Sequence, residues 1–378
     1  MQLESELVEI TEGSTKLLVP RESLVDKVPP KEPAFFNPRA KISRDFSIIA
    51  YAAFLKNFKG PKTFLDSLSG IGARSIRVAN ELGEIEQVFV NDVNPKALEI
   101  AENISKLNNV TKCVFSENEA CRFLSLHSRR DQRGAIVDVD PFGSPSRYLD
   151  CAIRATFHGG LLSVTATDLT VLHGLFPAAC KRKYHGVPVR AEYGNEIALR
   201  LILGCTSQVA GRLDVKIEPL FVQNNMHYYK TYVRILVRNG DEDDMGYILN
   251  CKNCGNRHAT KETKYECDKC KSKAEIAGPL WVGSLYDKDF MDEMILKEER
   301  LEVDKSCKKI LEKCRDEIGM PPTYFTIDEL AHMKRSAPIS LAKTVEKIQK
   351  AGFRASATSL NPAAFKTDAP VDSILSII

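Results

Sequence analysis

Short apolar runs alternate with helix-type patterns through the first half of the chain, and this alternation constrains the fold more than any other feature. The runs have the length of buried strands and lie at residues 63–65, 87–90, 112–115, 134–137 and 160–165. Helical patterns separate most of them, at residues 73–82, 95–107 and 149–156. Strands and helices that alternate at this spacing predict an α/β fold with a mainly parallel, doubly wound sheet.

Two longer strand patterns follow, at residues 214–222 and 227–237, with a short polar turn between them. They predict an antiparallel hairpin at one edge of the sheet. A helical pattern at residues 43–56 precedes the alternating region. After the hairpin, the acidic run of residues 241–244 indicates a domain boundary, and helical patterns dominate from about residue 284.

The composition is that of an ordinary globular protein. The 378 residues are enough for two or three domains, and they are 43% hydrophobic and 27% charged. No run approaches the ~18 apolar residues that a membrane span needs, and the acidic N-terminal stretch does not fit a secretory signal. We therefore expect a soluble cytoplasmic protein without membrane contact, and no feature indicates an obligate protein partner. The net charge of +3 is too small to indicate nucleic-acid binding by itself.

The loop after the first strand has the pattern D-x-x-x-G-x-G, with Asp66, Gly70 and Gly72 at its defined positions. Glycine lets the backbone turn tightly and approach a ligand closely. A dinucleotide-binding loop would have a third glycine where this chain has Ser75. An aspartate in this loop is a poor neighbour for a pyrophosphate and suits a ligand with a positive end. S-adenosylmethionine, whose sulfonium and ammonium groups are positive, is therefore the predicted cofactor.

Acidic residues also follow the second and third strands. Asp92 ends the second strand, where a carboxylate can accept hydrogen bonds from both ribose hydroxyls. Its alternative role is that of an N-cap for the helix that opens at Pro95. Glu119 and Ala120 follow the third strand, and we expect them to contact the adenine of the cofactor. Helix capping would use the same residue types at this position.

The fourth strand leads into the stretch Asp138-Val139-Asp140-Pro141-Phe142-Gly143-Ser144-Pro145. In isolation such a stretch is typical of a turn, but the carboxyl end of this strand would lie beside the methyl group of the cofactor. An exocyclic amine of a nucleobase is a poor nucleophile, because its lone pair is delocalised into the ring. A carboxylate and a backbone carbonyl can hold its N–H groups while an aromatic ring stacks on the base. We assign these roles to Asp140, the Pro141 carbonyl and Phe142, with Asp138 either supporting them or ending the strand.

Together these motifs resemble the tRNA guanine-26 N2-dimethyltransferases over most of the chain. The resemblance rests on residues 36–39, 44–45, 66–74, 91–92, 118–120, 138–145, 164–168, 193–196 and 361–368. It implies a Rossmann-like class I methyltransferase sheet that transfers two methyl groups from S-adenosylmethionine to N2 of one guanine in tRNA, at position 26. One departure is Glu119, where we would expect a shorter aspartate.

The resemblance also implies that Arg44 and Arg74 help to bind the cofactor, where either could pair with its carboxylate. A second aromatic ring, Phe35 or Phe36, would sandwich the base against Phe142, and packing in the core is the alternative for both. Two other functions stay open. One is methyl transfer to a different amine, such as N6 of adenine, N2 of guanine in rRNA or an amine in a protein. The other is an RNA-binding scaffold whose methyltransferase fold is inert.

Four of the eleven cysteines, Cys251, Cys254, Cys267 and Cys270, form the pattern C-x2-C-x12-C-x2-C. Two such knuckles predict a zinc-ribbon-like module whose four thiolates close a tetrahedral, structural Zn²⁺ site. A metal-free cluster, reduced or disulfide-bonded, is the alternative. The other seven cysteines show no framework spacing, and we expect several of them, which lie in apolar segments, to be reduced core residues: Cys113, Cys121, Cys151, Cys180, Cys205, Cys307 and Cys314.

Residues 324–368 have the pattern of a small α+β, winged-helix-like domain. Its basic residues fit a surface that faces RNA, with an ordinary solvated surface as the alternative: Lys334, Arg335, Lys343, Lys347 and Arg354. We therefore divide the chain into a methyltransferase domain with an N-terminal extension (1–245), a cysteine module (246–283) and a C-terminal RNA-binding domain (284–378). The predicted partner of the protein is tRNA.

Overall fold

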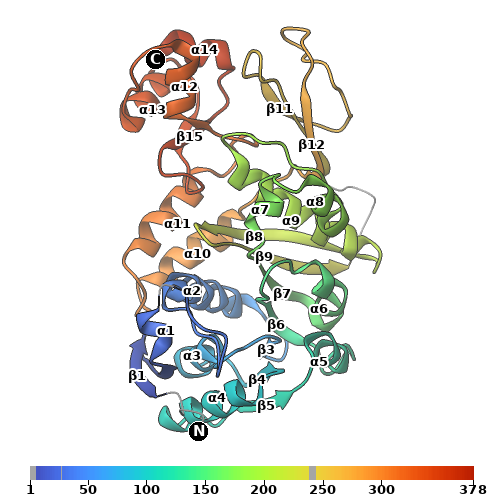
Figure 1. Ribbon diagram of the computed structural model, residues 1–378, viewed down its shortest axis with the longest axis vertical. Helices are drawn as coiled ribbons and strands as arrows, with labels where there is room; N and C mark the ends of the chain where they lie inside the picture. Colours follow the sequence, from blue (N-terminus) through green and yellow to red (C-terminus); the bar gives the residue numbers. More distant parts are fainter. Residues whose placement is uncertain (1–5, 27, 238–243) are drawn as a thin grey trace.

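The computed structural model describes residues 6–26, 28–237 and 244–378. The main sheet and its helices fill one end of an elongated molecule, and the last helices of the chain lie at the other end (Figure 1). Of the acidic run predicted as a domain boundary, residues 241–243 lie outside the described residues. No helix in the described ranges is long and apolar enough to cross a membrane.

A seven-stranded sheet has the strand order β5-β4-β3-β6-β7-β9-β8. Its strands are β3 (Thr63–Asp66), β4 (Gln87–Asp92), β5 (Cys113–Glu117), β6 (Gly134–Val139), β7 (Thr156–Ala166), β8 (Val215–Asn225) and β9 (Tyr228–Val237). The first five strands are parallel, and β9 runs antiparallel to both β7 and β8. The predicted α/β fold, with a mostly parallel sheet and an antiparallel edge hairpin, is therefore confirmed.

Two series of helices pack against this sheet (Figure 1). One contains α2 (Lys41–Asn57), α3 (Ala73–Glu81) and α4 (Pro95–Leu107), and the other α5 (Ala120–Leu126), α6 (Leu149–Ala155) and α9 (Gly194–Gly211). Proline suits the first turn of α4, and the Asn94 side chain caps this helix by accepting from the Lys96 backbone N–H at 3.0 Å. The short helices α7 (Leu169–Leu172) and α8 (Pro177–Tyr184) precede α9.

An N-terminal hairpin, β1 (Leu7–Glu12) and β2 (Thr15–Pro20), was not among the predicted elements. Strand β2 contacts α3 and α4, and it buries Leu17 and Val19 in a small core of its own. Because two strands alone are marginal in water, the hairpin depends on this packing rather than on its own sequence pattern. It is followed by α1 (Glu22–Val25) and a 3-10 turn, η1 (Pro38–Ala40); a second such turn, η2 (Ser146–Tyr148), precedes α6.

The remaining elements form two smaller sheets and their helices. Strands β10 (Met245–Asn250), β11 (Arg257–Thr260) and β12 (Glu275–Trp281) pair in the order β11-β10-β12, and helices α10 (Lys288–Glu298) and α11 (Ser306–Asp316) follow. The last sheet contains β13 (Phe325–Thr326), β14 (Ala355–Ala357) and β15 (Ala364–Thr367), with helices α12 (Ile327–Lys334), α13 (Leu341–Lys350) and α14 (Val371–Ile377). This last part has the predicted order of two helices followed by a β wing.

The hydrophobic cores show how these parts are joined. Helices α10 and α11 contribute Met291 and Leu311 to the large core around the main sheet, and both contact α2. The last part has a separate core that includes Phe325, Ile348 and Phe365. The three-part division of the chain stays a prediction, and the packing places α10 and α11 with the main sheet.

Two of the seven cysteines outside the zinc pattern are not reduced, and their pairing was not predicted. Cys121 of α5 and Cys151 of α6 form a disulfide, with their Cα atoms 5.7 Å apart. They are separated by 30 residues in the sequence, and only the contact between α5 and α6 brings them together. No spacing rule could have paired them, because the partner is chosen by helix packing. The other predicted core cysteines are free.

Candidate active site and zinc centre

Carboxylates gather where the neighbouring parallel strands end. Asp66 ends β3 and lies in register with Asp138 of β6, and Asp92 ends β4 on the other side. Ligands of open α/β sheets bind at these carboxyl ends, beside the point where the strand order reverses. Here the reversal lies between β3 and β6, so the predicted site residues of both strands meet at one edge.

The glycine loop lies between these strands and has the close packing that requires glycine. Gly70 and Gly72 have positive φ angles of +54° and +73°, and a Cβ on Gly72 would lie 2.8 Å from the Cβ of Ala101. The Gly70 backbone N–H donates to Asp92 Oδ2 at 2.7 Å. Asn94 caps α4, so Asp92 is not the N-cap. The Asp92 carboxylate instead joins β4 to the glycine loop.

Asp66 is buried beneath this loop and accepts a hydrogen bond from Ser75 Oγ at 2.6 Å. Ser75 stands where a dinucleotide-binding loop would have its third glycine, and its hydroxyl serves the aspartate. Burial raises the pKa of Asp66 to about 7, and the negative charge of Asp138 adds to this effect. A carboxyl group with this pKa is only partly ionised at neutral pH, and a positive ligand beside it would favour its ionised form.

Glu119 occupies the capping role that was its alternative. It is the N-cap of α5, and its Oε2 accepts from the Arg122 backbone N–H at 3.0 Å. Ala120 is buried beside it. Between Asp92 and the cap of α4, the Val93 side chain is 66% exposed.

The Asp-Pro-Phe loop is held by Arg74, which bridges its two aspartates. One guanidinium nitrogen of Arg74 donates to Asp138 Oδ2, and the other donates to Asp140 Oδ2 at 2.6 Å. The loop is closed further along, where the Gly143 backbone N–H donates to Thr167 Oγ1 at 2.6 Å. Arg74 therefore contacts the predicted catalytic loop directly, an arrangement that the sequence did not indicate.

Asp138 is fully buried and lies at the centre of a hydrogen-bond network. Its Oδ1 accepts from Tyr51 Oη at 2.7 Å, Ser163 Oγ at 2.6 Å and Lys230 Nζ at 2.7 Å. Burial alone would raise the pKa of Asp138, but the positive charges of Arg74 and Lys230 hold it far below the usual range. The network residues are the main omission of the sequence analysis. The only signal was Lys230 itself, a lysine within an apolar strand pattern.

Two aromatic rings lie beside this network. Phe142 is 63% exposed, and the ring of Phe35 meets it edge-on, with 4.7 Å between the centroids. Phe36 is only 2% exposed and packs in the N-terminal core. Of the two candidates for a second stacking ring, Phe35 is therefore the one at the site, and Phe36 has the alternative role of core packing.

Arg44 has partners within the protein. Its guanidinium donates to both carboxylate oxygens of Glu12, at 2.7 and 2.6 Å, and to the Asn37 carbonyl. It also lies 4.8 Å from the ring centroid of Phe36. These contacts attach the N-terminal hairpin to α2, so Arg44 supports the wall that contains Phe35.

A cavity of about 640 Å³ lies elsewhere in the molecule. It is lined by residues such as Thr63 and Gln87, where β3 and β4 begin, together with His127 and Arg133. None of its lining residues is a predicted site residue. The polar and aromatic groups suited to chemistry lie at the opposite, carboxyl end of the same strands.

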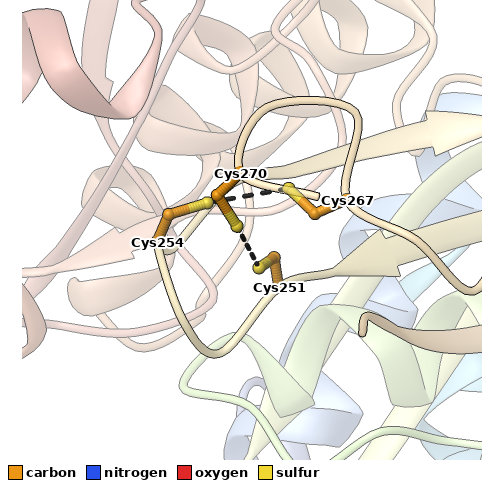
Figure 2. Close-up of side chains that lie close together, drawn as sticks. All are labelled: Cys251, Cys254, Cys267 and Cys270. Atoms are coloured by element: carbon orange, nitrogen blue, oxygen red, sulfur yellow. Dashed lines mark hydrogen bonds between the residues drawn. The ribbon is translucent and has the colours of Figure 1, made fainter. Parts of the chain in front are cut away.

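The four cysteines of the repeated knuckle converge on one point (Figure 2). Their Sγ atoms all lie within 4.8 Å of one another, and two pairs are 3.5 and 3.6 Å apart. Thiolates at about 2.3 Å from a tetrahedral Zn²⁺ lie about 3.8 Å from one another. Side-chain amides of Asn253 and Asn256 approach the sulfurs of Cys270 and Cys267 at 3.5 and 3.6 Å. The four thiols and their spacing fit a structural zinc ion.

Known proteins resemble this chain over nearly its whole length in sequence and in structure. The family model described as N2,N2-dimethylguanosine tRNA methyltransferase matches residues 13–378. The tRNA (guanine(26)-N(2))-dimethyltransferase of Methanothermobacter thermautotrophicus is 34% identical, over 98% of each chain. A relative from Aquifex aeolicus, named for guanines 26 and 27, is 31% identical over 88% of each chain.

A solved structure gives the same relationship. Trm1 from Pyrococcus horikoshii, determined with S-adenosyl-L-methionine, aligns with a TM-score of 0.85 and 28% identity. The alignment covers 98% of this chain and 100% of that one. The chain therefore belongs to the N2,N2-dimethylguanosine tRNA methyltransferase family.

Proposed function

We propose that this protein transfers methyl groups from S-adenosylmethionine to the exocyclic N2 of guanine 26 in tRNA, giving N2-methyl- and then N2,N2-dimethylguanosine. The family match supports the reaction class and the substrate. The observation that carries the proposal is the position of Asp140 and Phe142, which follow β6 beside the glycine loop. An acceptor for N–H groups and a stacking surface for a base thus lie next to the cofactor site.

The residues at the ends of β3, β4 and β5 fit the cofactor from its charged end to its adenine. Asp66 offers a buried carboxylate to the positive end, next to Gly70 and Gly72. Asp92 presents its carboxylate to the ribose, and Val93, Glu119 and Ala120 border the place of the adenine. The bound cofactor supplies a methyl group on a good leaving group, so the protein has to position the acceptor amine and exclude water. Arg74 acts on the catalytic loop, through Asp138 and Asp140, and supports the cofactor site indirectly.

In this proposal Asp140 accepts an N–H of the guanine amino group. Its Oδ2 is occupied by Arg74, whereas its Oδ1 has no hydrogen-bond partner within the described ranges. The Asp140 side chain is 28% exposed, so the free oxygen can reach a substrate. With the Pro141 carbonyl as a second acceptor, the amine is held and its lone pair turns toward the methyl group. Each transfer breaks the bond between the sulfonium and the methyl group, forms the N2–CH3 bond and releases one N–H proton to the Asp140 carboxylate, which passes it to solvent. After one transfer a single N–H remains, and Asp140 can hold it for the second transfer.

Phe142 and Phe35 supply the surfaces that hold the base. Phe142 is exposed despite its apolar ring, and Lys31 Nζ lies 5.2 Å from its centroid. An exposed ring beside a cation is suited to stacking on a base whose phosphate lies nearby. The guanine would have to leave the stack of the tRNA to reach it.

We assign the parts beyond the main sheet to tRNA binding. The proposal places the protein in the cytoplasm and gives it no obligate protein partner. The zinc-ribbon-like module would be structural, and the C-terminal domain would contact phosphates. Among its basic residues, Lys334 is bound to the C-terminal Ile378 and Arg354 to Asp368. Arg335, Lys343 and Lys347 are exposed, which makes them the better candidates for RNA contacts.

Incubation of the protein with methyl-labelled S-adenosylmethionine and a tRNA transcript, followed by nucleoside analysis, tests this function. We expect labelled N2-methylguanosine followed by N2,N2-dimethylguanosine, both lost when guanine 26 is replaced by adenine. Label at guanine 27 would extend the activity to the neighbouring position, a second site that the name of the Aquifex relative includes. Labelled N6-methyladenosine without labelled guanosine would contradict the proposal, and no transfer at all would favour the inert scaffold.

A further inference from the structure

Lys230 is a fully buried lysine behind the catalytic loop, on β9. Its Nζ donates to Asp138 Oδ1 at 2.7 Å and to Thr165 Oγ1 at 3.0 Å. Burying a charged lysine is costly unless it is paired, and here both its partners lie on the nearby strands β6 and β7 of the same sheet. Lys230 cannot reach a substrate, so any role in the reaction passes through Asp138.

Three ion pairs connect Lys230 to the catalytic loop. Lys230 pairs with Asp138, Asp138 pairs with Arg74, and Arg74 pairs with Asp140. The four side chains of this series alternate in charge, so the two cations, Lys230 and Arg74, balance the two carboxylates, Asp138 and Asp140. Only the last member, Asp140, is appreciably exposed, at 28% of its side chain.

Without Lys230 this balance fails at Arg74. Arg74 would then be the one cation left in this cluster, and it would face the carboxylates of both Asp138 and Asp140. Asp138 is fully buried, so bulk water does not reach its charge, whereas Asp140 is partly exposed. The buried Asp138 carboxylate would therefore attract the Arg74 guanidinium more strongly than Asp140 does. Asp140 would then lose the contact that orients it.

We propose that Lys230 is a positioning residue for methyl transfer, which neutralises Asp138 and thereby leaves Arg74 to hold Asp140 in its reactive orientation. This proposal rests on the role given to Asp140 above. The charge of Lys230 acts on Asp140 through two intervening side chains, Asp138 and Arg74. Lys230 does not touch the cofactor or the base.

The test compares the full-length wild type with Lys230→Met, Asp138→Asn/Lys230→Met and Tyr51→Phe. The readouts are the single-turnover methylation rate at saturating tRNA and cofactor, and the dissociation constant of S-adenosylhomocysteine from calorimetry. We expect Lys230→Met to slow transfer about 100-fold, the cost of a misplaced reacting group, with cofactor affinity changed less than about threefold. Tyr51→Phe removes an uncharged hydrogen bond from the same Asp138 oxygen, and it should slow transfer no more than about fivefold.

The double variant separates positioning from damage to the fold. Asp138→Asn removes the competing carboxylate, so Arg74 returns to Asp140, and the introduced amide can still face the hydroxyls of Tyr51 and Ser163. We expect the double variant to transfer about tenfold faster than Lys230→Met, because the two changes compensate. Simple structural damage would instead accumulate.

A Lys230→Met enzyme within threefold of the wild-type rate would overturn the proposal, as would a double variant no faster than Lys230→Met. If Lys230→Met does not fold, the double variant alone decides: it must fold and transfer within about tenfold of wild type, and either failure overturns the proposal. Wild type and Asp140→Ala are measured in parallel. No transfer by the wild type would refute the proposed function itself rather than the role of Lys230. Full transfer by Asp140→Ala would leave the proposed function standing, but it would remove Asp140 from the mechanism and overturn the role of Lys230 with it.

Discussion

The protein contains two buried ionic clusters with similar composition and different surroundings. The site cluster consists of Lys230, Asp138, Arg74 and Asp140, at the carboxyl end of the main sheet. The junction cluster consists of Glu196, Arg200, Lys366 and Glu317, where α9 meets the C-terminal part. In the junction cluster Glu196 Oε1 accepts from Lys366 Nζ at 2.8 Å and from Arg200 Nη2 at 2.8 Å.

The two clusters differ in what their carboxylates can reach. Every member of the junction cluster is at most 3% exposed, and Glu196 Oε2 and Glu317 Oε2 have no hydrogen-bond partner in the described parts of the chain. Burial alone would raise the pKa of Glu196, but Lys366 and Arg200 lower it below its ordinary value. The site cluster instead ends in Asp140, which has a free oxygen at a partly exposed position. Buried charge by itself does not indicate a function; an open end beside a ligand-binding edge does.

The sharpest test of this difference is Asp140→Ala. Loss of the acceptor for the amine should slow methyl transfer about 1000-fold, with little change in stability because the side chain is partly exposed. Asp150→Ala is the matched control, since Asp150 is an exposed aspartate on α6 that pairs with the exposed Arg154. Single-turnover rates for both variants measure the effect, and equal rates would remove Asp140 from the mechanism.

The junction cluster should show the opposite behaviour. Glu196→Ala leaves the buried Arg200 without its carboxylate and leaves Lys366 with only Glu317 Oε2, 3.7 Å away, within this cluster. This should cost about 3 kcal/mol of unfolding free energy. Cofactor affinity should stay within about twofold, because the cluster lies away from the cofactor site. Urea unfolding and calorimetric titration with S-adenosylhomocysteine give both quantities. Glu346→Ala, which breaks an exposed pair with Lys350, should cost less than about 0.5 kcal/mol; similar losses for the two variants would argue against the comparison.

The same comparison can be made for two apolar side chains, the exposed Phe142 at the site and the buried Phe36. Phe142→Ala should lower kcat/KM for tRNA by about 30-fold, the loss of one stacked base contact of about 2 kcal/mol, without lowering stability. Phe36→Ala should instead cost about 3 kcal/mol of unfolding free energy, because its ring is buried. Kinetics with a tRNA transcript and urea unfolding separate the two effects. A stability loss for Phe142→Ala would show that its ring is a packing residue after all.

The smallest expected effect is the pH dependence of cofactor binding at Asp66. Burial and the charge of Asp138 raise the pKa of Asp66 to about 7, and only its ionised form attracts the positive end of S-adenosylmethionine. Its ionised fraction falls from about three quarters at about pH 7.5 to about one tenth at about pH 6, so affinity should fall about eightfold as pH decreases. Calorimetric titration at both pH values measures this, and Asp66→Asn should bind weakly at both. Affinity that does not change with pH would contradict the role of Asp66.

Local patterns explain how much of the fold was predictable. The parallel strands and their helices follow from periodicity, because each buries one face or both. The N-terminal hairpin was missed, since its strands are stabilised by contacts with α3 and α4 rather than by their own pattern. The Cys121–Cys151 disulfide was missed for the same reason. The zinc ligands were predictable because all four lie in two short knuckles.

The candidate site divides in the same way. Asp66 and Asp92 could be found because each ends a strand, and the Asp-Pro-Phe loop because it follows one. The ends of parallel strands share an edge of the sheet. The sequence could not show which of Phe35 and Phe36 lies at the site, because both are phenylalanines in adjacent positions and they differ only in burial. Tyr51, Ser163 and Lys230 come from α2, β7 and β9, and no local pattern relates them to Asp138.

The sequence by itself determined the succession of strands and helices along the chain. It also determined the glycine loop, the acidic residues at the strand ends and the cysteine knuckles, because short-range sterics and spacing define these features. Only the tertiary structure decided which cations serve which carboxylates. Arg74 and Lys230 meet Asp138 from segments far apart in the chain, and the strength of a buried ion pair depends on distance and on exclusion of water. Both quantities exist only once the sheet has formed.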